Sequence, residues 1–327
     1  MVRYDKIFSI IDIKEENLLS VDSELLNILL KDNSSGRNII WATNDYKYNG
    51  IGFEFESEIT ISKITGSYKD LIKSRSKKNK EEKEARSKNN AEVFTPSWIC
   101  NEQNNLADES WFERTNVFNK SGNKGWITNY NKIEFKGKTW QDYVKSTRLE
   151  ISCGEAPYLV SRYDTVTGKS IKVEDRIGLL DRKLRIVSEN NLNEEEWIEW
   201  SIVAVKNVYG FDWQGDNILL ARENLLYTYI DYYYNKFNKK PDIKLIKEIA
   251  NIISWNIWQM DGIKYVIPNS CKNEKVTEIT LFGNITKEYT CEGCKTGNNK
   301  KHNGIYCKIM NWDTNRKIKF ETLLKKK

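Results

Sequence analysis

Long hydrophobic runs are missing from this sequence of 327 residues. No segment has the length and purity of a membrane-spanning helix, which needs about 20 apolar residues. The chain opens with MVRYDKIFSIIDIKEEN, and acidic residues come too early there for a secretory signal peptide. No internal repeat is visible. We therefore expect a cytoplasmic protein without a membrane partner.

Proline and histidine are scarce, with four prolines and one histidine. The only Pro-Asp pair is Pro241-Asp242, and no Glu-x-Lys or Asp-x-Lys triplet follows it. The triplet Glu134-Phe135-Lys136 has no Pro-Asp before it. Restriction nucleases that build their metal site from this combination are therefore disfavoured.

Charge is nearly balanced, with a net charge of +6 that is compatible with nucleic-acid binding but does not indicate it alone. Hydrophobic residues make up 39% of the chain, enough to bury a sizeable core. Basic residues gather in residues 73–90, KSRSKKNKEEKEARSKNN, and in the final Lys325–Lys327. Both segments fit a solvated surface, and phosphate contact is the alternative.

The pattern of apolar segments predicts an α/β fold in three regions. Residues 1–90 read as a strand-rich N-terminal region, with strand-like segments at 37–42 and 51–62, a helix at 23–30 and a basic linker at the end. Strand-like and helix-like segments alternate in residues 91–267, which favours a doubly wound sheet. Residues 268–327 hold a Cys-rich insertion and the C-terminal tail.

A strand predicted over Arg148–Ser152 runs into the small-residue turn Cys153–Pro157. The next segment, Tyr158–Tyr163, is expected to continue as a helix. This is a cofactor-binding geometry, because small residues let a ligand approach the backbone and a helix N-terminus attracts an anion. A purely structural turn fits the pattern equally well.

Two further strands are predicted to end in acids, over residues 207–212 and 255–261. Asp212 precedes Trp213 and a long helix at 217–234, and is placed to hold ribose hydroxyls. Trp213 is suited to pack on an adenine ring, and Asp261 to accept a hydrogen bond from its amino group. The alternatives are a helix cap for Asp212, a core position for Trp213 and a turn for Asp261. Three parallel strands would bring these ends together in one ligand site.

These segments, in this order, resemble the gamma-type DNA adenine-N6 methyltransferases of restriction-modification systems. The residues that carry the resemblance are EVFTPSWICN at 92–101, EISCGEAPYL at 150–159, YGFDWQGDNILLARENLL at 209–226 and NIWQMDG at 256–262. In the second segment, Glu150 and Ala156 replace an Asp and a Gly of the family pattern. The resemblance implies a Rossmann-like sheet that binds S-adenosylmethionine (SAM).

Carried over residue by residue, the resemblance assigns a binding role to each matching position. It places Phe94, Thr95 and Pro96 along the cofactor, and Glu150, Cys153 and Gly154 at its methionine part. It places Asp212 at the ribose, and Trp213 and Asp261 at the adenine.

The catalytic motif of that family, Asn or Asp followed by Pro-Pro and an aromatic residue, is absent. The prolines are Pro96, Pro157, Pro241 and Pro268, and no two are adjacent. We interpret the chain as the SAM-binding subunit of a split enzyme that is inactive alone. A second subunit would complete the sheet, supply the motif and recognise double-stranded DNA. The alternative is a catalytically inactive regulatory module that binds DNA or protein.

Four cysteines near the C-terminus predict a structural zinc site. Cys271, Cys291, Cys294 and Cys307 follow the spacing C-x19-C-x2-C-x12-C, which supplies four thiolates for a tetrahedron. His302 is an alternative ligand that can replace one of them. A site with four protein ligands leaves no open position for catalysis.

Overall fold

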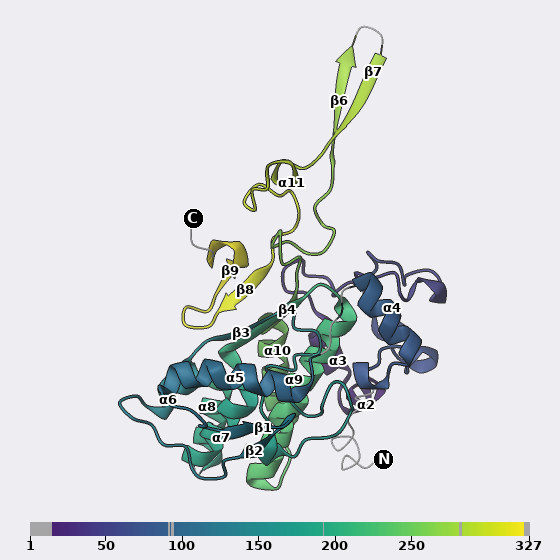
Figure 1. Cartoon of the computed structure of the whole chain (residues 1–327). Helices are drawn as coiled ribbons and strands as arrows, with labels where there is room; N and C mark the ends of the chain where they lie inside the picture. Colours follow the sequence, from purple (N-terminus) through teal and green to yellow (C-terminus); the bar gives the residue numbers. More distant parts are fainter. Residues whose placement is uncertain (1–14, 91, 93–94, 192, 281–282, 324–327) are drawn as a thin grey trace.

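The computed structural model describes residues 15–90, 92, 95–191, 193–280 and 283–323 (Figure 1). These residues form a mixed α/β structure with one three-stranded parallel sheet and several two-stranded antiparallel pairs. The helices are α2 (Glu15–Val21), α3 (Ser23–Leu30), α4 (Lys80–Asn90), α5 (Ser97–Phe112), α6 (Trp140–Lys145), α7 (Leu179–Asn190), α8 (Glu194–Lys206), α9 (Gly215–Phe237), α10 (Ile243–Asn256) and α11 (Glu292–Thr296). The strands are β1 (Asn119–Gly122), β2 (Gly125–Thr128), β3 (Arg148–Ile151), β4 (Val208–Asp212), β5 (Ile257–Gln259), β6 (Glu274–Thr280), β7 (Gly283–Tyr289), β8 (Lys308–Asn311) and β9 (Arg316–Lys319).

The parallel sheet has the order β3-β4-β5, so β4 lies in the centre. The strands predicted around residues 148–152 and 207–212 are confirmed as β3 and β4. The third is shorter than predicted, because Trp255 and Asn256 belong to the last turn of α10. Since all three strands run the same way, their carboxyl ends open on one edge of the sheet.

Helices α8, α9 and α10 pack against this sheet. The long helix predicted after Asp212 is confirmed as α9. It begins at Gly215, where a Cβ atom would lie 2.0 Å from the carbonyl oxygen of Ile40. A glycine is therefore needed for the N-terminal segment to pass the start of α9.

The N-terminal region is not strand-rich, which corrects the prediction for the part of it that the structure describes. The helix predicted at 23–30 is confirmed as α3, but residues 37–42 and 51–62 form only isolated bridges, Lys31 to Asn38 and Ile40 to Glu58. Gly50 and Gly52 adopt φ angles of +100° and +88°, which interrupt the extended backbone. The apolar residues that suggested strands, such as Trp41 and Ile59, are instead buried in the core.

One hydrophobic core joins the N-terminal region to the predicted SAM-binding region. It contains Leu26, Trp41 and Ile59 together with Leu219 and Ile257. A second, smaller cluster packs the C-terminal segment against the sheet. Side chains on both sides of residue 90 therefore share one core.

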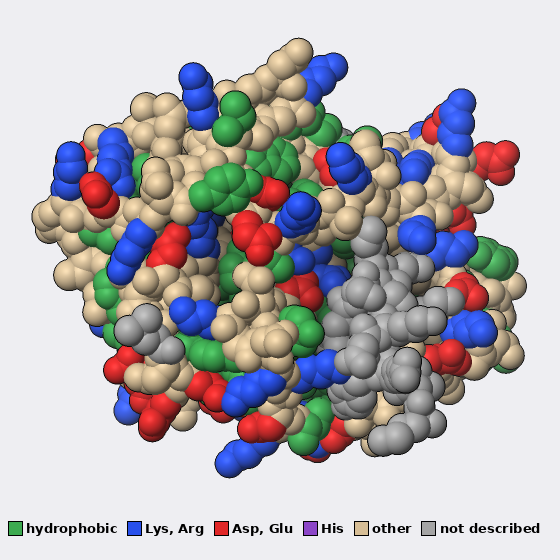
Figure 2. Space-filling model, turned by 90° about the horizontal axis from the view of Figure 1, so that it is seen from below, with side chains coloured by type: hydrophobic (Ala, Val, Ile, Leu, Met, Phe, Trp, Pro, Cys, Tyr) green, Lys and Arg blue, Asp and Glu red, His purple; other side chains and the backbone are tan. Residues whose placement is uncertain are grey.

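The part of the C-terminal region that contains β6, β7 and α11 projects from this body, and we call it the arm (Figure 1). Its end is the hairpin of β6 and β7, and α11 lies between the hairpin and the body. None of the described helices combines the length and apolar character that crossing a membrane requires. On the face shown in Figure 2, basic and acidic side chains are interspersed, in keeping with the small net charge.

Candidate ligand cavity and metal site

A cavity of about 1320 Å³ lies at the carboxyl ends of β3 and β4. Its lining comes from four parts of the chain: the turn at 42–45 with Phe55, helices α4 and α5 with their flanks, the loop after β3, and the loop after β4. The predicted site residues that line it are Thr95, Glu150, Cys153, Gly154, Asp212 and Trp213. The fold therefore brings together side chains that are far apart in the sequence.

The loop after β3 has an unusual backbone. Ser152, Gly154 and Ala156 adopt φ angles of +51°, +52° and +63°, a left-handed conformation that costs a non-glycine residue about 1–2 kcal/mol. Strain of this kind gathers at ligand-binding loops. A Cβ atom added to Gly154 would meet nothing within 4 Å, so this glycine faces open space in the cavity.

No helix follows this loop directly, which corrects the prediction for residues 158–163. The segment has a turn at Tyr158 and Leu159 followed by irregular backbone, and the next α-helix, α7, begins at Leu179. The reason lies in Glu150, whose carboxylate oxygens accept hydrogen bonds from the backbone N–H groups of Tyr158 (3.3 Å) and Leu159 (3.2 Å). These bonds fold the loop back over the end of β3. This loop therefore does not lead into a helix whose N-terminus could hold an anion at the end of β3.

Burial raises the pKa of Glu150 to about 8, although these two backbone hydrogen bonds oppose the shift. The carboxyl group is therefore partly protonated at neutral pH. Its position beneath the loop indicates that it holds the loop in shape. The loop, in turn, presents Gly154 to the cavity.

Asp212, at the end of β4, connects the two strand-end loops. It accepts hydrogen bonds from the backbone N–H groups of Gly154 (2.9 Å) and Gln214 (2.9 Å), and from the side chain of Asn217 (3.4 Å). Burial raises its pKa, against the effect of these bonds. Each carboxylate oxygen has two lone pairs, so the group retains acceptor capacity toward the cavity.

Trp213 is 39% exposed and faces the cavity, so it is not a core residue. Its indole N–H donates to the carbonyl oxygen of Ala42 at 3.0 Å, which fixes the ring. Phe55, half-buried on the same wall, meets it edge-on, with ring centroids 6.2 Å apart. No local pattern around Phe55 predicted that it would reach this site.

The remaining predicted residues lie elsewhere. The carboxylate of Asp261 accepts from the backbone N–H groups of Ile263 (2.9 Å) and Lys264 (3.0 Å), so this residue stabilises a turn and does not line the cavity. Pro96 precedes α5 at its N-cap and does not line the cavity either. Phe94 falls outside the described residues.

The charged segment before residue 91 contributes a buried ion-pair network beside the cavity. Arg86 of α4 is 4% exposed and pairs with Asp216 (2.7 Å) at the start of α9 and with Glu92 (2.8 Å). Burial alone would raise the pKa of Asp216, but Arg86 and Lys78 lower it to about 2. Arg86 is therefore an internal anchor of α4, which the pattern of a solvated basic linker did not reveal.

The arm contains a cluster of metal-ligand type, formed by Cys271, Cys291, Cys294 and His302, whose ligand atoms all lie within 4.8 Å of one another. Cys307 is not part of it, which corrects the predicted ligand set. This cysteine is fully buried in the smaller core cluster, and its thiol contacts the carbonyl oxygen of Gln259 at 3.3 Å. His302 takes its place, as the alternative from the sequence allowed.

The spacing of these atoms fits a tetrahedral metal ion. The Sγ atoms of Cys271 and Cys294 are 3.5 Å apart, and Nδ1 of His302 lies 3.6 Å from Sγ of Cys271, 3.8 Å from that of Cys291 and 3.7 Å from that of Cys294. Zinc–sulfur bonds of about 2.3 Å give a tetrahedron with edges of about 3.8 Å. The four residues can therefore hold a metal ion such as zinc.

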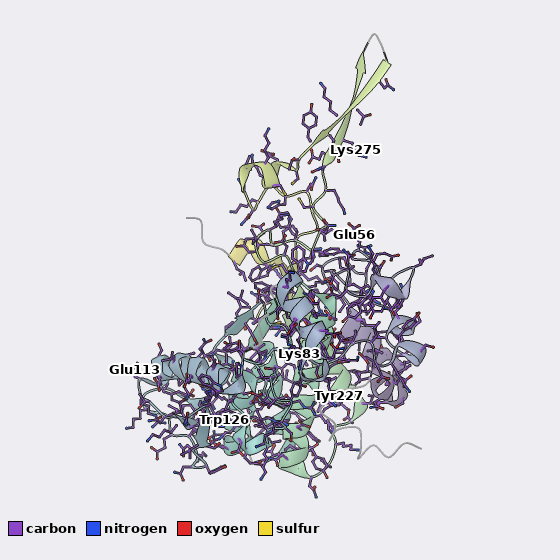
Figure 3. The ribbon with its side chains drawn as sticks, turned by 45° about the vertical axis from the view of Figure 1, so that its right-hand side comes forward. Glu56, Lys83, Glu113, Trp126, Tyr227 and Lys275 are labelled. Atoms are coloured by element: carbon purple, nitrogen blue, oxygen red, sulfur yellow. The ribbon has the colours of Figure 1, made fainter. Side chains whose placement is uncertain are left out.

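An ion pair and a hydrogen bond connect the base of the arm to the body. Glu56, from the N-terminal region, pairs with Lys272 at 2.5 Å and accepts a hydrogen bond from Asn269 at 2.6 Å. Figure 3 places Glu56 at the base of the arm and Lys275 on the hairpin beyond it. The metal cluster thus lies between an anchored base and a projecting hairpin.

Comparison of the chain with models of protein families, with curated proteins and with solved structures returns no match.

Proposed function

We propose that this chain is the SAM-binding subunit of a split DNA adenine-N6 methyltransferase. In this proposal the parallel sheet is an incomplete Rossmann-like sheet, and a partner chain completes it. The observation that carries the proposal is the cavity at the carboxyl ends of β3 and β4, where Gly154, Asp212 and Trp213 face one space. Parallel α/β sheets bind their ligands at this edge.

The lining offers a suitable group for each part of the methyl donor. The open space above Gly154 lets the methionine part approach the backbone of the loop. Asp212 can accept a hydrogen bond from a ribose hydroxyl through its remaining lone pair on Oδ2. Trp213 presents a fixed aromatic ring to the base.

The sequence lacks the groups that would activate the target. The exocyclic amine of adenine is a poor nucleophile, and methylation requires acceptors for its protons and an aromatic ring for the flipped base. The motif that supplies them needs adjacent prolines, which this chain does not have. A partner subunit is therefore expected to bring these groups, together with recognition of double-stranded DNA.

The free edge of β3 is a suitable place for that partner. Among the described residues, β3 pairs only with β4. Leu149 is 43% exposed and Ile151 is 69% exposed, although both belong to a parallel sheet. Parallel sheets are normally covered on both faces, and an open apolar edge promotes strand pairing. A strand of the partner can pair here and place its residues at the cavity.

We assign the metal cluster a structural role, with zinc as the ion. Three thiolates and one imidazole complete a tetrahedron without an open position, which is the arrangement of structural zinc sites. The ion would hold α11 and the base of the hairpin together. No catalytic step is assigned to it.

Calorimetry of the full chain with SAM tests the donor site. We expect binding, and we expect Asp212→Asn to raise the Kd about tenfold because a charged acceptor is lost. Asp261→Asn is the matched control, since Asp261 also follows a sheet strand but lies outside the cavity. Absence of binding in a folded sample, alone and with its partner, would refute the proposal.

Transfer of a tritiated methyl group to DNA tests the split. We expect no methylation by this chain alone, and activity when the product of the neighbouring gene is added. Ile151→Lys should abolish association with that product. Ile127→Lys, on the separate strand β2 where the isoleucine is 73% exposed, should not. Methylation by this chain alone would contradict the split, and donor binding without methylation in the presence of the partner would favour the regulatory alternative.

A further inference from the structure

One wall of the cavity is built by the N-terminal region, from residues 42–45 and Phe55. The side chain of Gln259, at the end of β5, holds this wall in place. Its amide nitrogen donates to the carbonyl oxygens of Ile40 (2.8 Å) and Trp213 (2.8 Å), and its oxygen accepts from the N–H of Ile40 (2.9 Å). The segment is therefore fixed beside the sheet where β4 ends.

Two aromatic rings meet at an angle on this side of the cavity. The rings of Phe55 and Trp213 lie at 67° to each other with centroids 6.2 Å apart. Both side chains line the cavity and neither is fully buried. A flat ring that stacks on one of them can turn its edge toward the other, which is a favourable arrangement of aromatic groups.

The wall also presents a carboxamide that has no partner among the described residues. Asn44 lines the cavity and is exposed, and its side chain makes no hydrogen bond there. Its neighbours are engaged, because the hydroxyl of Thr43 accepts from the N–H of Asp45 (3.2 Å) and Asp45 pairs with Arg86 (3.7 Å). Ala42, which starts the turn, has a left-handed φ of +52°. In this turn the carboxamide of Asn44 is thus free to donate one hydrogen bond and to accept another in one plane.

We propose that this wall is the adenine site of the donor, with the base held against Phe55 and Trp213 and its edge read by Asn44. The inference rests on the proposed function and deepens it, because it moves adenine recognition from Asp261 to the N-terminal region. A carboxamide pairs with the amino group and N7 of adenine through one acceptor and one donor. On the same edge a hypoxanthine ring presents two acceptors, O6 and N7, so a carboxamide cannot make both bonds in either orientation.

The test compares S-adenosylhomocysteine with its deaminated analogue, S-inosylhomocysteine, by calorimetry on the full chain. We expect the wild type to prefer the adenine compound about tenfold, as a good bidentate contact to a base provides. Asn44→Ala should remove this preference. Asn123→Ala, in the exposed turn between β1 and β2, is the matched control and should keep it. Phe55→Ala should weaken both compounds about tenfold, as expected for a lost stacking partner.

The outcomes separate the two proposals. If the wild type binds the adenine compound and Asn44→Ala and Phe55→Ala leave its Kd and its preference unchanged, the adenine site lies elsewhere while the donor site stands. If the folded wild type binds neither compound, the donor site itself is refuted, and the adenine site with it. Tyr48→Ala, a substitution at a ring that is 79% exposed and outside the cavity, shows whether loss of any aromatic ring nearby has the same effect.

Discussion

The metal cluster allows a prediction that distinguishes two cysteines to which their spacing assigns the same ligand role. Cys294 is exposed and belongs to the cluster, whereas Cys307 is fully buried and does not. We expect Cys294→Ser to lose the metal ion and Cys307→Ser to retain it. His302→Cys should also retain it, because a fourth thiolate replaces the imidazole, and His302→Ala should not.

The expected loss of zinc affinity follows from the number of ligands. Structural zinc sites in small domains bind with about 10–16 kcal/mol. Shared among four ligands, this is about 3 kcal/mol each, or roughly a hundredfold in Kd for one lost ligand. The core of the body contains none of the cluster residues, so loss of metal should unfold the arm and leave the body folded.

Two measurements check this prediction. Mass spectrometry of the purified full chain, after dialysis against a chelator whose affinity for zinc lies between the two expected values, should give one zinc ion per chain for the wild type and for Cys307→Ser, and none for Cys294→Ser. Hydrogen exchange after chelation should rise in residues 271–306 and remain slow in α9. The reasoning is refuted if Cys307→Ser loses the ion while Cys294→Ser keeps it, or if the wild type takes up no zinc on reconstitution.

Three further predictions concern the cavity and its surroundings. Arg86→Leu should destabilise the protein by about 3–5 kcal/mol in urea denaturation, because Asp216 would keep its buried charge without its ion-pair partner. Gly154→Ala should cost only about 1–2 kcal/mol of stability for its left-handed backbone, yet weaken donor binding by calorimetry, because the added methyl group enters the cavity. Glu150 has a folded pKa of about 8, above its ordinary value of 4.5, so its contribution to stability is present at low pH and lost as the pH rises through 8. The wild type should therefore lose more stability than Glu150→Gln between about pH 6 and about pH 9, and an equal loss in urea denaturation would contradict this.

Local patterns predicted the elements of this fold better than they predicted its contacts. The strands ending near Ile151 and Asp212 and the helix α9 follow from periodicity within one segment, and the structure contains them. Phe55 could not be assigned to the cavity, because its place depends on hydrogen bonds between Gln259 and Ile40, 219 positions apart. No periodicity connects such distant residues.

The errors at individual residues have the same origin. Cysteine spacing suggested Cys307 as a ligand, but the chain passes back into the core cluster before reaching it, and the nearby His302 faces the thiols instead. Arg86 stands in a segment rich in lysine and glutamate, and only the approach of Asp216 makes it a buried partner. Side-chain roles were therefore wrong where a distant segment decides burial.

The two faces of the parallel sheet are covered unequally. Leu149 and Ile151 of β3 stand in register with Tyr209 and Phe211 of β4, so these four side chains share one face. Over β4 and β5 this face is covered by the C-terminal segment, where Phe320 packs on Phe211 and on Trp258 with ring centroids 6.0 and 5.2 Å apart.

Within the described residues, that cover stops before β3. The exposed apolar side chains of Leu149 and Ile151 and the unpaired backbone edge therefore both belong to β3, and this strand borders the cavity. A partner that pairs with β3 would bury Ile151 and close the cavity in one step. We therefore expect donor binding and partner binding to strengthen each other, because each orders the same end of the sheet.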